Sequence, residues 1–277
     1  MEKKLEVSII SPVFNERENL KTFVDSVIKV MHSTGMSWEL IVVDDGSDDG
    51  STTVIKELTN QDNIKCLLLA KNYGQTTAIQ AGFDNAIGKY LVTLDSDLQN
   101  DPKDIPALLH KLIEEELDLV VGWRKNRKDN YFLRNLPSSI ANKLIGNITG
   151  VKLHDYGCSL KAYRADVLKE VRLYGEMHRF IPAWMATKIP ASKISELVVT
   201  HHPRIAGKSK YGISRTFRVF VDLISVYFFM RFFSRPGHFF GLIGLLLSSI
   251  GSLILIYLVS LKFIYGLDIG DRPLLIA

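Results

Sequence analysis

The sequence predicts an α/β fold, in which a mainly parallel sheet has helices on both faces and is followed by interfacial helices and a C-terminal transmembrane helix. Three observations predict it. Apolar runs alternate with amphipathic runs over the first 122 residues, polar residues follow the apolar runs, and a long uncharged apolar stretch lies near the C-terminus.

The alternation gives four strand–helix units. The predicted strands cover residues 5–13, 38–44, 64–70 and 89–95, and the helices that follow them cover residues 18–33, 51–59, 75–86 and 102–115. Residues 117–122 add a fifth strand. Because these strands are nearly continuous Val, Ile and Leu, we expect them to be buried on both faces, as in parallel sheets.

The C-terminal part predicts a membrane anchor. Residues 239–261 form a 23-residue stretch without Asp, Glu, Lys or Arg, and a helix of that length can cross a hydrocarbon layer of roughly 30 Å. Arginines at 215, 218, 231 and 235 precede it, and the positive-inside tendency therefore places the globular domain in the cytoplasm at the cell membrane.

The segment between these regions is rich in aromatic residues. We interpret residues 213–233 as a helix at the lipid headgroups, with Phe217, Phe220, Phe228 and Phe229 below the arginines; an ordinary core helix is the alternative. The predicted organisation is a catalytic domain over residues 1–212, interface helices over 213–235 and a transmembrane region over 236–277. That last region holds one clear span and the beginning of a second.

Composition excludes several classes. The net charge of +4 is too small to indicate nucleic-acid binding. Cys66 and Cys158 lack the spacing of a zinc site or a disulfide framework, which fits a reducing compartment. The N-terminus has no apolar stretch of the secretory type.

The sequence Asp95-Ser96-Asp97 predicts a metal site. It follows an apolar strand, and residues two apart on an extended chain project to one side. Two carboxylates there suit Mg²⁺ or Mn²⁺, and Gln99 adds a neutral oxygen. The alternative is a polar turn that caps the next helix.

Two further acidic clusters also follow strands, at Asn15-Glu16 and Asp44-Asp45. Since ligands of parallel sheets bind beyond the carboxyl ends of the strands, we expect one shared site. Asp45 is expected to accept hydrogen bonds from a nucleobase or ribose. Asp48, Asp49 and Ser51 are expected to make the turn and the helix cap.

Basic residues cluster after the fifth strand. Arg124 and Arg134 are candidates for binding phosphate, because guanidinium groups match phosphate oxygens, whereas Lys125 and Lys128 suit a solvated loop. Asp155 is open to two interpretations. It either acts as a base or orients Lys161 or Arg164.

Four motifs together resemble family 2 glycosyltransferases, and among them the polyprenyl-phosphate sugar transferases of the dolichol-phosphate mannose synthase type. They are Ser-Pro-Val-Phe-Asn-Glu-Arg-Glu-Asn-Leu at 11–20, Val-Val-Asp-Asp-Gly-Ser at 42–47, Leu-Asp-Ser-Asp-Leu-Gln at 94–99 and Arg-Ile-Ala-Gly-Lys-Ser-Lys-Tyr-Gly at 204–212. The resemblance implies a Rossmann-like GT-A fold.

The resemblance also implies roles for individual residues. Pro12, Glu16 and Asp45 would hold the nucleoside, and Arg204 and Lys210 would steady the donor diphosphate. The metal would face Asp95, Asp97 and Gln99, and the acceptor phosphate would face Arg124, Arg134 and Ser138.

The activity implied is hexosyl transfer from a nucleotide sugar to undecaprenyl or dolichyl phosphate, with inversion, for glycosylation of the cell envelope. The sequence does not identify the nucleobase or the sugar; UDP-glucose or a similar UDP-sugar is favoured over GDP-mannose as the donor. A lipid phosphate is already an anionic nucleophile and needs little help from a base. A homo-oligomer is compatible with the sequence. The alternatives are a family 2 enzyme with a soluble or glycan acceptor, and an inactive membrane adaptor that binds nucleotide or anionic lipid.

Overall fold

The structure is a computed structural model. It describes residues 5–125, 145–146, 150–203, 221, 224–225, 227–229, 231–232 and 235–266. The chain divides into two compact units, Met1–Val226 and Tyr227–Ala277, and each is described by itself.

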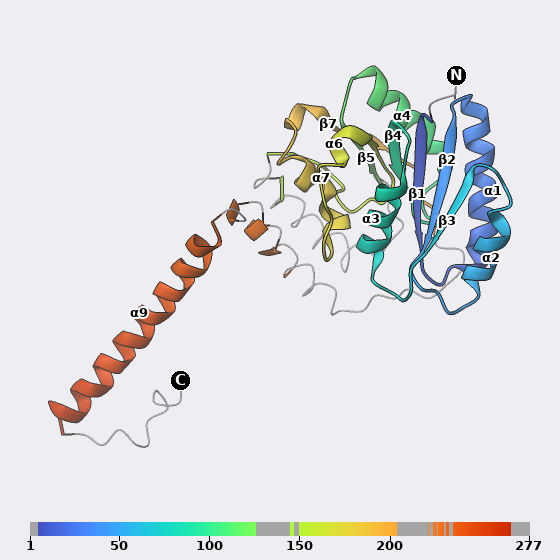
Figure 1. Cartoon of the computed structure of the whole chain (residues 1–277). Coiled ribbons are helices and arrows are strands. Elements are labelled where there is room, and N and C mark those ends of the chain that lie inside the picture. The colour runs from blue at the N-terminus through green and yellow to red at the C-terminus, as the bar shows by residue number, and fades with distance from the viewer. Residues whose placement is uncertain are drawn as a thin grey trace. The chain divides into compact units, whose positions relative to one another are not determined.

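The first unit is built on a seven-stranded sheet of order β3-β2-β1-β4-β6-β5-β7 (Figure 1). Its strands are β1 (Val7–Val13), β2 (Trp38–Asp44), β3 (Ile64–Leu68), β4 (Tyr90–Thr93), β5 (Leu119–Trp123), β6 (Lys161–Arg164) and β7 (Ile194–Val198). All neighbouring pairs are parallel except those of β6, which runs antiparallel to β4 and to β5. The sheet is therefore mainly parallel, as predicted.

Helices cover both faces of this sheet. They are α1 (Arg17–Thr34), α2 (Ser51–Leu58), α3 (Gln75–Asn85), α4 (Ile105–Glu114), α6 (Ala165–Leu168) and α7 (Ile181–Met185), with short 3₁₀ turns η1 (Pro102–Asp104), η3 (Met177–Phe180) and η4 (Ala191–Lys193). Helix α1 packs against α2 and α4, whereas α3 packs over β1 and β2 (Figure 1). This sandwich buries β1 and β2 almost completely.

The boundaries of α1 show why the sequence folds locally as it does. Its apolar positions recur at helical spacing, and Leu20, Phe23, Val27 and Met31 are fully buried. The helix ends where Gly35 takes a left-handed conformation with φ of 69°, which a glycine adopts without steric cost. The predicted helix over 18–33 is confirmed to within a residue at each end.

The later strands depend on long-range pairing. β6 has only four residues and is inserted between β4 and β5, where Lys161 pairs with both Thr93 and Val121. Neither β6 nor β7 was predicted, because four or five residues carry too little periodicity to indicate a strand. The predicted helix over 102–115 begins as the 3₁₀ turn η1 and becomes α4 at Ile105.

The long helix α9 (Pro236–Phe263) belongs to the second unit. With 28 residues it is long and apolar enough to cross a membrane, and nearly all of its apolar side chains are exposed. Before it, Phe228 packs against Phe239 and Phe240. The predicted interfacial helix falls largely outside the described residues, including Phe217 and Phe220.

Candidate active site

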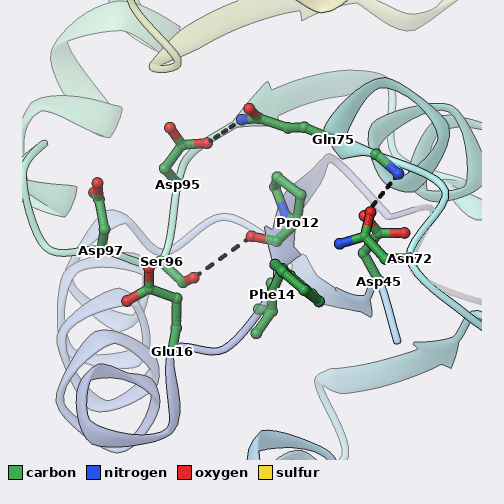
Figure 2. A pocket seen from close by; sticks show the side chains of 11 residues that line it. Pro12, Phe14, Glu16, Asp45, Asn72, Gln75, Asp95, Ser96 and Asp97 are labelled. Atoms are coloured by element: carbon green, nitrogen blue, oxygen red, sulfur yellow. Dashed lines mark hydrogen bonds between the residues drawn. The ribbon is translucent and has the colours of Figure 1, made fainter. Parts of the chain in front are cut away.

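A pocket of about 220 Å³ opens at the carboxyl ends of β1, β2 and β4. Four segments, each at the carboxyl end of a strand or in the loop that follows it, form the wall of the pocket. They contribute Pro12, Val13, Phe14 and Glu16; Asp45; Asn72, Gly74 and Gln75; and Asp95, Ser96 and Asp97. Figure 2 shows Asp45 and Asn72 on one side, Asp95 and Asp97 on the other, and Pro12 with Phe14 between them. The structure thus brings together five residues proposed from the sequence, Pro12, Glu16, Asp45, Asp95 and Asp97.

The loop after β1 is fixed by the loop after β2. Asn15 and Asp48 bind each other reciprocally: the Asn15 side-chain amide donates to Asp48 Oδ1 at 2.7 Å, and the Asp48 N–H donates to Asn15 Oδ1 at 3.0 Å. The N–H of Arg17 donates to Asp49 Oδ2 at 3.1 Å. Asp49 also accepts from the backbone N–H of Ser51, which agrees with the predicted turn. These bonds hold Glu16 at the pocket. The predicted side-chain helix cap is wrong, because the N-cap of α2 is Gly50, which makes no side-chain capping bond.

The loop after β2 is joined in turn to the loop after β3. The Asp45 carboxylate accepts the N–H groups of Tyr73 at 2.7 Å and Gly74 at 2.9 Å. Burial raises the pKa of Asp45, although these two amides oppose the rise. Gly46 has a φ of 69°, and a Cβ there would lie 2.4 Å from the carbonyl carbon of Lys71. Only glycine allows the two loops to come this close.

Asp95 and Ser96, on the acidic side of the pocket, bond to residues from two other segments of the pocket wall. Gln75 Nε2 donates to Asp95 Oδ1 at 2.8 Å, and the Ser96 hydroxyl makes a long bond of 3.5 Å to the Pro12 carbonyl (Figure 2). Burial and the neighbouring charge of Asp97 raise the pKa of Asp95 to about 6. Four successive loops are therefore linked around one cavity.

Asp95 and Asp97 fit a divalent cation. Hard cations such as Mg²⁺ take few protein carboxylates and complete their coordination with substrate phosphates and water. Among the described residues no cluster of three or more His, Cys, Asp or Glu side chains is arranged to hold a metal ion. The backbone N–H of Gln99 donates to Asp97 Oδ1 at 3.1 Å, and Gln99 is not among the described residues that line the pocket.

A second charged group lies beside the acid pair. Arg124, which follows β5, donates from Nε to Asp155 Oδ2 at 2.7 Å and from Nη2 to Asp155 Oδ1 at 3.0 Å. The side chains are 16% and 6% exposed. Lys161 is also buried; its Nζ donates to the Cys158 carbonyl oxygen. The positive charges of Lys161 and Arg124 favour the ionised form of Asp95.

The sequence left open whether Asp155 acts as a base or orients Lys161 or Arg164, and its contacts answer part of this question. Its carboxylate orients Arg124, whereas Arg164 lies near Asp118 and Asp166. Arg134, Ser138, Arg204 and Lys210 lie outside the described residues.

Sequence reasoning assigned no site role to the other residues that line the pocket, which are Val13, Phe14, Asn72, Gly74, Gln75 and Ser96. Phe14 lies within the motif at residues 11–20, which resembles family 2 glycosyltransferases. Asn72 and Gln75 follow a strand end, in the sequence Lys71-Asn-Tyr-Gly-Gln, and that position was the available signal.

A mainly parallel sheet with a pocket at its carboxyl edge, and an aspartate pair in the wall of that pocket, fits the class of GT-A glycosyltransferases. The family model described as "Glycosyl transferase family 2" matches residues 8–172. The chain belongs to this family and is an enzyme.

Similar proteins agree with this assignment. The chain is 56% identical over 275 residues to a dodecaprenyl-phosphate galacturonate synthase of Rhizobium johnstonii, an alignment that covers 99% of this chain and 81% of the relative. It is 36% identical over 266 residues to an undecaprenyl-phosphate 4-deoxy-4-formamido-L-arabinose transferase of Shewanella sediminis, covering 95% and 78%.

Two solved structures share the fold. Mannosyl-3-phosphoglycerate synthase from Rubrobacter xylanophilus has a TM-score of 0.65 at 13% identity, covering 81% of this chain and 74% of that one. Glucosyl-3-phosphoglycerate synthase from Mycobacterium tuberculosis, in complex with Mn²⁺, UDP and glucosyl-3-phosphoglycerate, has a TM-score of 0.62 at 16% identity, covering 82% and 80%. At these identities the likeness shows the fold alone.

Proposed function

We propose that this enzyme transfers a sugar from a nucleotide diphosphate donor to the phosphate of a polyprenyl lipid. The observation that carries the proposal is the pocket with Asp45 on one side and the Asp95–Asp97 pair on the other, in a chain 56% identical to a polyprenyl-phosphate sugar synthase. Helix α9 supplies a membrane anchor of adequate length.

The donor assignment follows the two sides of the pocket. The nucleoside occupies the side with Pro12, Phe14 and Asp45, and its diphosphate reaches Asp95 and Asp97. A Mg²⁺ or Mn²⁺ ion held by these carboxylates, with Gln99 nearby, would neutralise the charge that develops on the leaving diphosphate. UDP is the proposed nucleotide, and galacturonic acid, the sugar of the 56% identical relative, is the proposed sugar.

The reaction is a single displacement at the anomeric carbon. An oxygen of the lipid phosphate forms the new bond to this carbon as the bond to the diphosphate oxygen breaks, and the configuration inverts. Because the phosphate is already anionic, no base is needed. Arg124, held by Asp155, would bind the acceptor phosphate together with Arg134 and Ser138. Arg204 and Lys210 would bind the donor diphosphate.

We propose that the reaction takes place on the cytoplasmic face of the membrane. Arg231 and Arg235 lie upstream of α9, and positive residues favour the cytoplasmic side. The domain boundaries that we propose are residues 1–212 for catalysis, 213–235 for the interface and 236–277 for the membrane.

The test uses the full chain purified in detergent, Mn²⁺, polyprenyl phosphate and radiolabelled UDP-galacturonic acid, UDP-glucose or GDP-mannose. Label that enters the organic phase with UDP-galacturonic acid, and not in the Asp97→Ala variant, is the expected result. Label that remains water-soluble with every donor, even though nucleotide is released, would show that the sugar is transferred to water rather than to the lipid phosphate, and would overturn the lipid assignment.

A further inference from the structure

One buried contact joins the pocket to a distant segment that has no role in the assignment above. His178 belongs to η3, in the sequence His-Arg-Phe-Ile-Pro-Ala-Trp, and its Nδ1 lies 2.7 Å from Thr76 Oγ1, a hydrogen bond between residues 102 apart in sequence. Thr76 is 3% exposed, and Met177 and Phe180 on the same turn are buried. The imidazole is therefore held by a packed segment rather than by a free loop.

Thr76 lies on the turn of α3 that reaches the acid pair. Its neighbour Gln75 is the first residue of α3, and the Gln75 amide donates to Asp95 Oδ1 at 2.8 Å. On the other side, Gly74 has a φ of 94° and its N–H donates to Asp45. The first turn of α3 thus carries contacts to both sides of the pocket.

The first turn of α3 has no capping side chain at its N-terminus. The residue at the N-cap of α3 is Gly74, which makes no side-chain capping bond. A helix without a capping side chain depends on other partners to order its first turn. Asp45 accepts the N–H of Gly74 just before the helix, and His178 bonds to the side chain of Thr76 within its first turn, so two different parts of the chain hold this turn.

The His178 contact does not change with physiological pH. Burial lowers the pKa of His178 to about 3, and the charges of Arg179 and Lys161 act in the same direction. The imidazole is neutral at pH 7 and carries one ring proton. The contact with Thr76 is therefore a lasting neutral hydrogen bond rather than a proton switch.

We propose that His178 is a positioning residue of the donor site, which fixes the first turn of α3 through Thr76 so that Gln75 holds Asp95 in place. This proposal rests on the proposed function in one respect, namely that Asp95 serves the metal-bound diphosphate. Removal of the bond is expected to weaken metal–nucleotide binding without unfolding the protein.

The test measures binding of Mn²⁺ together with UDP to the detergent-solubilised full chain by calorimetry. Thr76→Val keeps the shape of the side chain and removes the hydroxyl, and His178→Leu removes the partner. Since one neutral hydrogen bond corresponds to about a 2- to 10-fold change in an equilibrium constant, each variant is expected to bind about fivefold more weakly. Thr76→Ser and His178→Asn, which keep a hydrogen-bonding atom, should bind like the wild type.

The neighbouring Thr77→Val is the matched control. Thr77 is exposed, and its hydroxyl bonds only to the Tyr73 carbonyl at 3.2 Å among the contacts described, so this variant should bind normally. The double variant Thr76→Val with His178→Leu should bind no more weakly than the single variants, since both remove one interaction.

Three results would overturn the proposal: Thr76→Val binding as tightly as Thr77→Val, losses that add in the double variant, or a lowered unfolding temperature with unchanged binding. The outcome is independent of the lipid assignment. A wild-type protein that binds Mn²⁺ and UDP yet glycosylates no polyprenyl phosphate would contradict the proposed acceptor. The comparison of the Thr76 and His178 variants would still be valid.

Discussion

Arg124 and Asp155 form a bidentate ion pair, in which the guanidinium donates from Nε to Asp155 Oδ2 at 2.7 Å and from Nη2 to Asp155 Oδ1 at 3.0 Å. Such a planar pair fixes the direction of the arginine. The arginine follows β5, and its charge acts on Asp95. The pair therefore orients a cation beside the acidic side of the pocket.

Asp155→Ala is expected to lower the free energy of unfolding by about 3 kcal/mol, because it leaves Arg124 without its buried partner. Transfer activity should fall with it. Asp155→Asn keeps one acceptor for Arg124 and should retain part of both. Denaturant unfolding and the transfer assay check this; an Asn variant that is fully stable but as inactive as Ala would indicate a base instead.

Asp97→Ala is expected to lower the transfer rate by about a thousandfold, since it removes one of two carboxylates that face the leaving diphosphate. Its extraction from membranes by detergent should match the wild type, because α9 is untouched. Organic-phase label measures transfer, and membrane fractionation is the control. Full activity of this variant would overturn the metal assignment.

The pH dependence of metal binding should report Asp95, whose pKa is raised to about 6. Below that value the carboxyl is protonated, so Mn²⁺ affinity should fall by about tenfold for each pH unit. The stability of the metal-free protein should change in the opposite direction, so that it is higher at low pH. A raised acid pKa stabilises the fold while the group is protonated, and this contribution is lost as pH rises from about 4 to 6.

Calorimetric titration with Mn²⁺ at several pH values tests the first effect, and thermal unfolding of the metal-free protein tests the second. Asp95→Asn cannot titrate, and it should remove this part of the pH dependence of unfolding. A wild-type affinity that stays level down to pH 5 would contradict the assignment.

Gly46→Ala should raise the KM for the donor by about tenfold and lower stability by about 2 kcal/mol. The new Cβ would meet the Lys71 backbone at 2.4 Å and push away the loop that carries Asn72 and Gln75. Gly35→Ala is the matched control, because Gly35 has the same φ of 69° but nothing within 4 Å. Equal effects of the two variants would show that backbone strain alone is responsible.

Asp49→Ala should cost about 1–2 kcal/mol, because it removes the acceptor for the N–H groups of Ser51 and Arg17. The freed loop should also raise the donor KM, since Glu16 lies next to Arg17 in the pocket wall. Asp62→Ala, on an exposed turn, is the control. Steady-state kinetics with unfolding measurements check both, and an unchanged KM would exclude a link between this loop and the donor.

Local sequence pattern determined most of the parallel half of the fold. Strands such as β2 are mostly apolar and buried on both faces, and α1 has helical periodicity and a glycine at its end. These signals lie within a few residues of one another. The gathering of Glu16, Asp45 and Asp95 was also predictable, because parallel strands present their carboxyl ends at one edge.

Only the tertiary structure decided which groups meet across the chain. β6 is a strand because β4 and β5 flank it, Arg124 is bound by Asp155 from 31 residues away, and His178 reaches Thr76 across 102 residues. No local pattern encodes such contacts, since each depends on how distant segments pack. The sequence by itself therefore determined the class of chemistry and where along the chain it lies, whereas long-range packing decided how each side chain is held there.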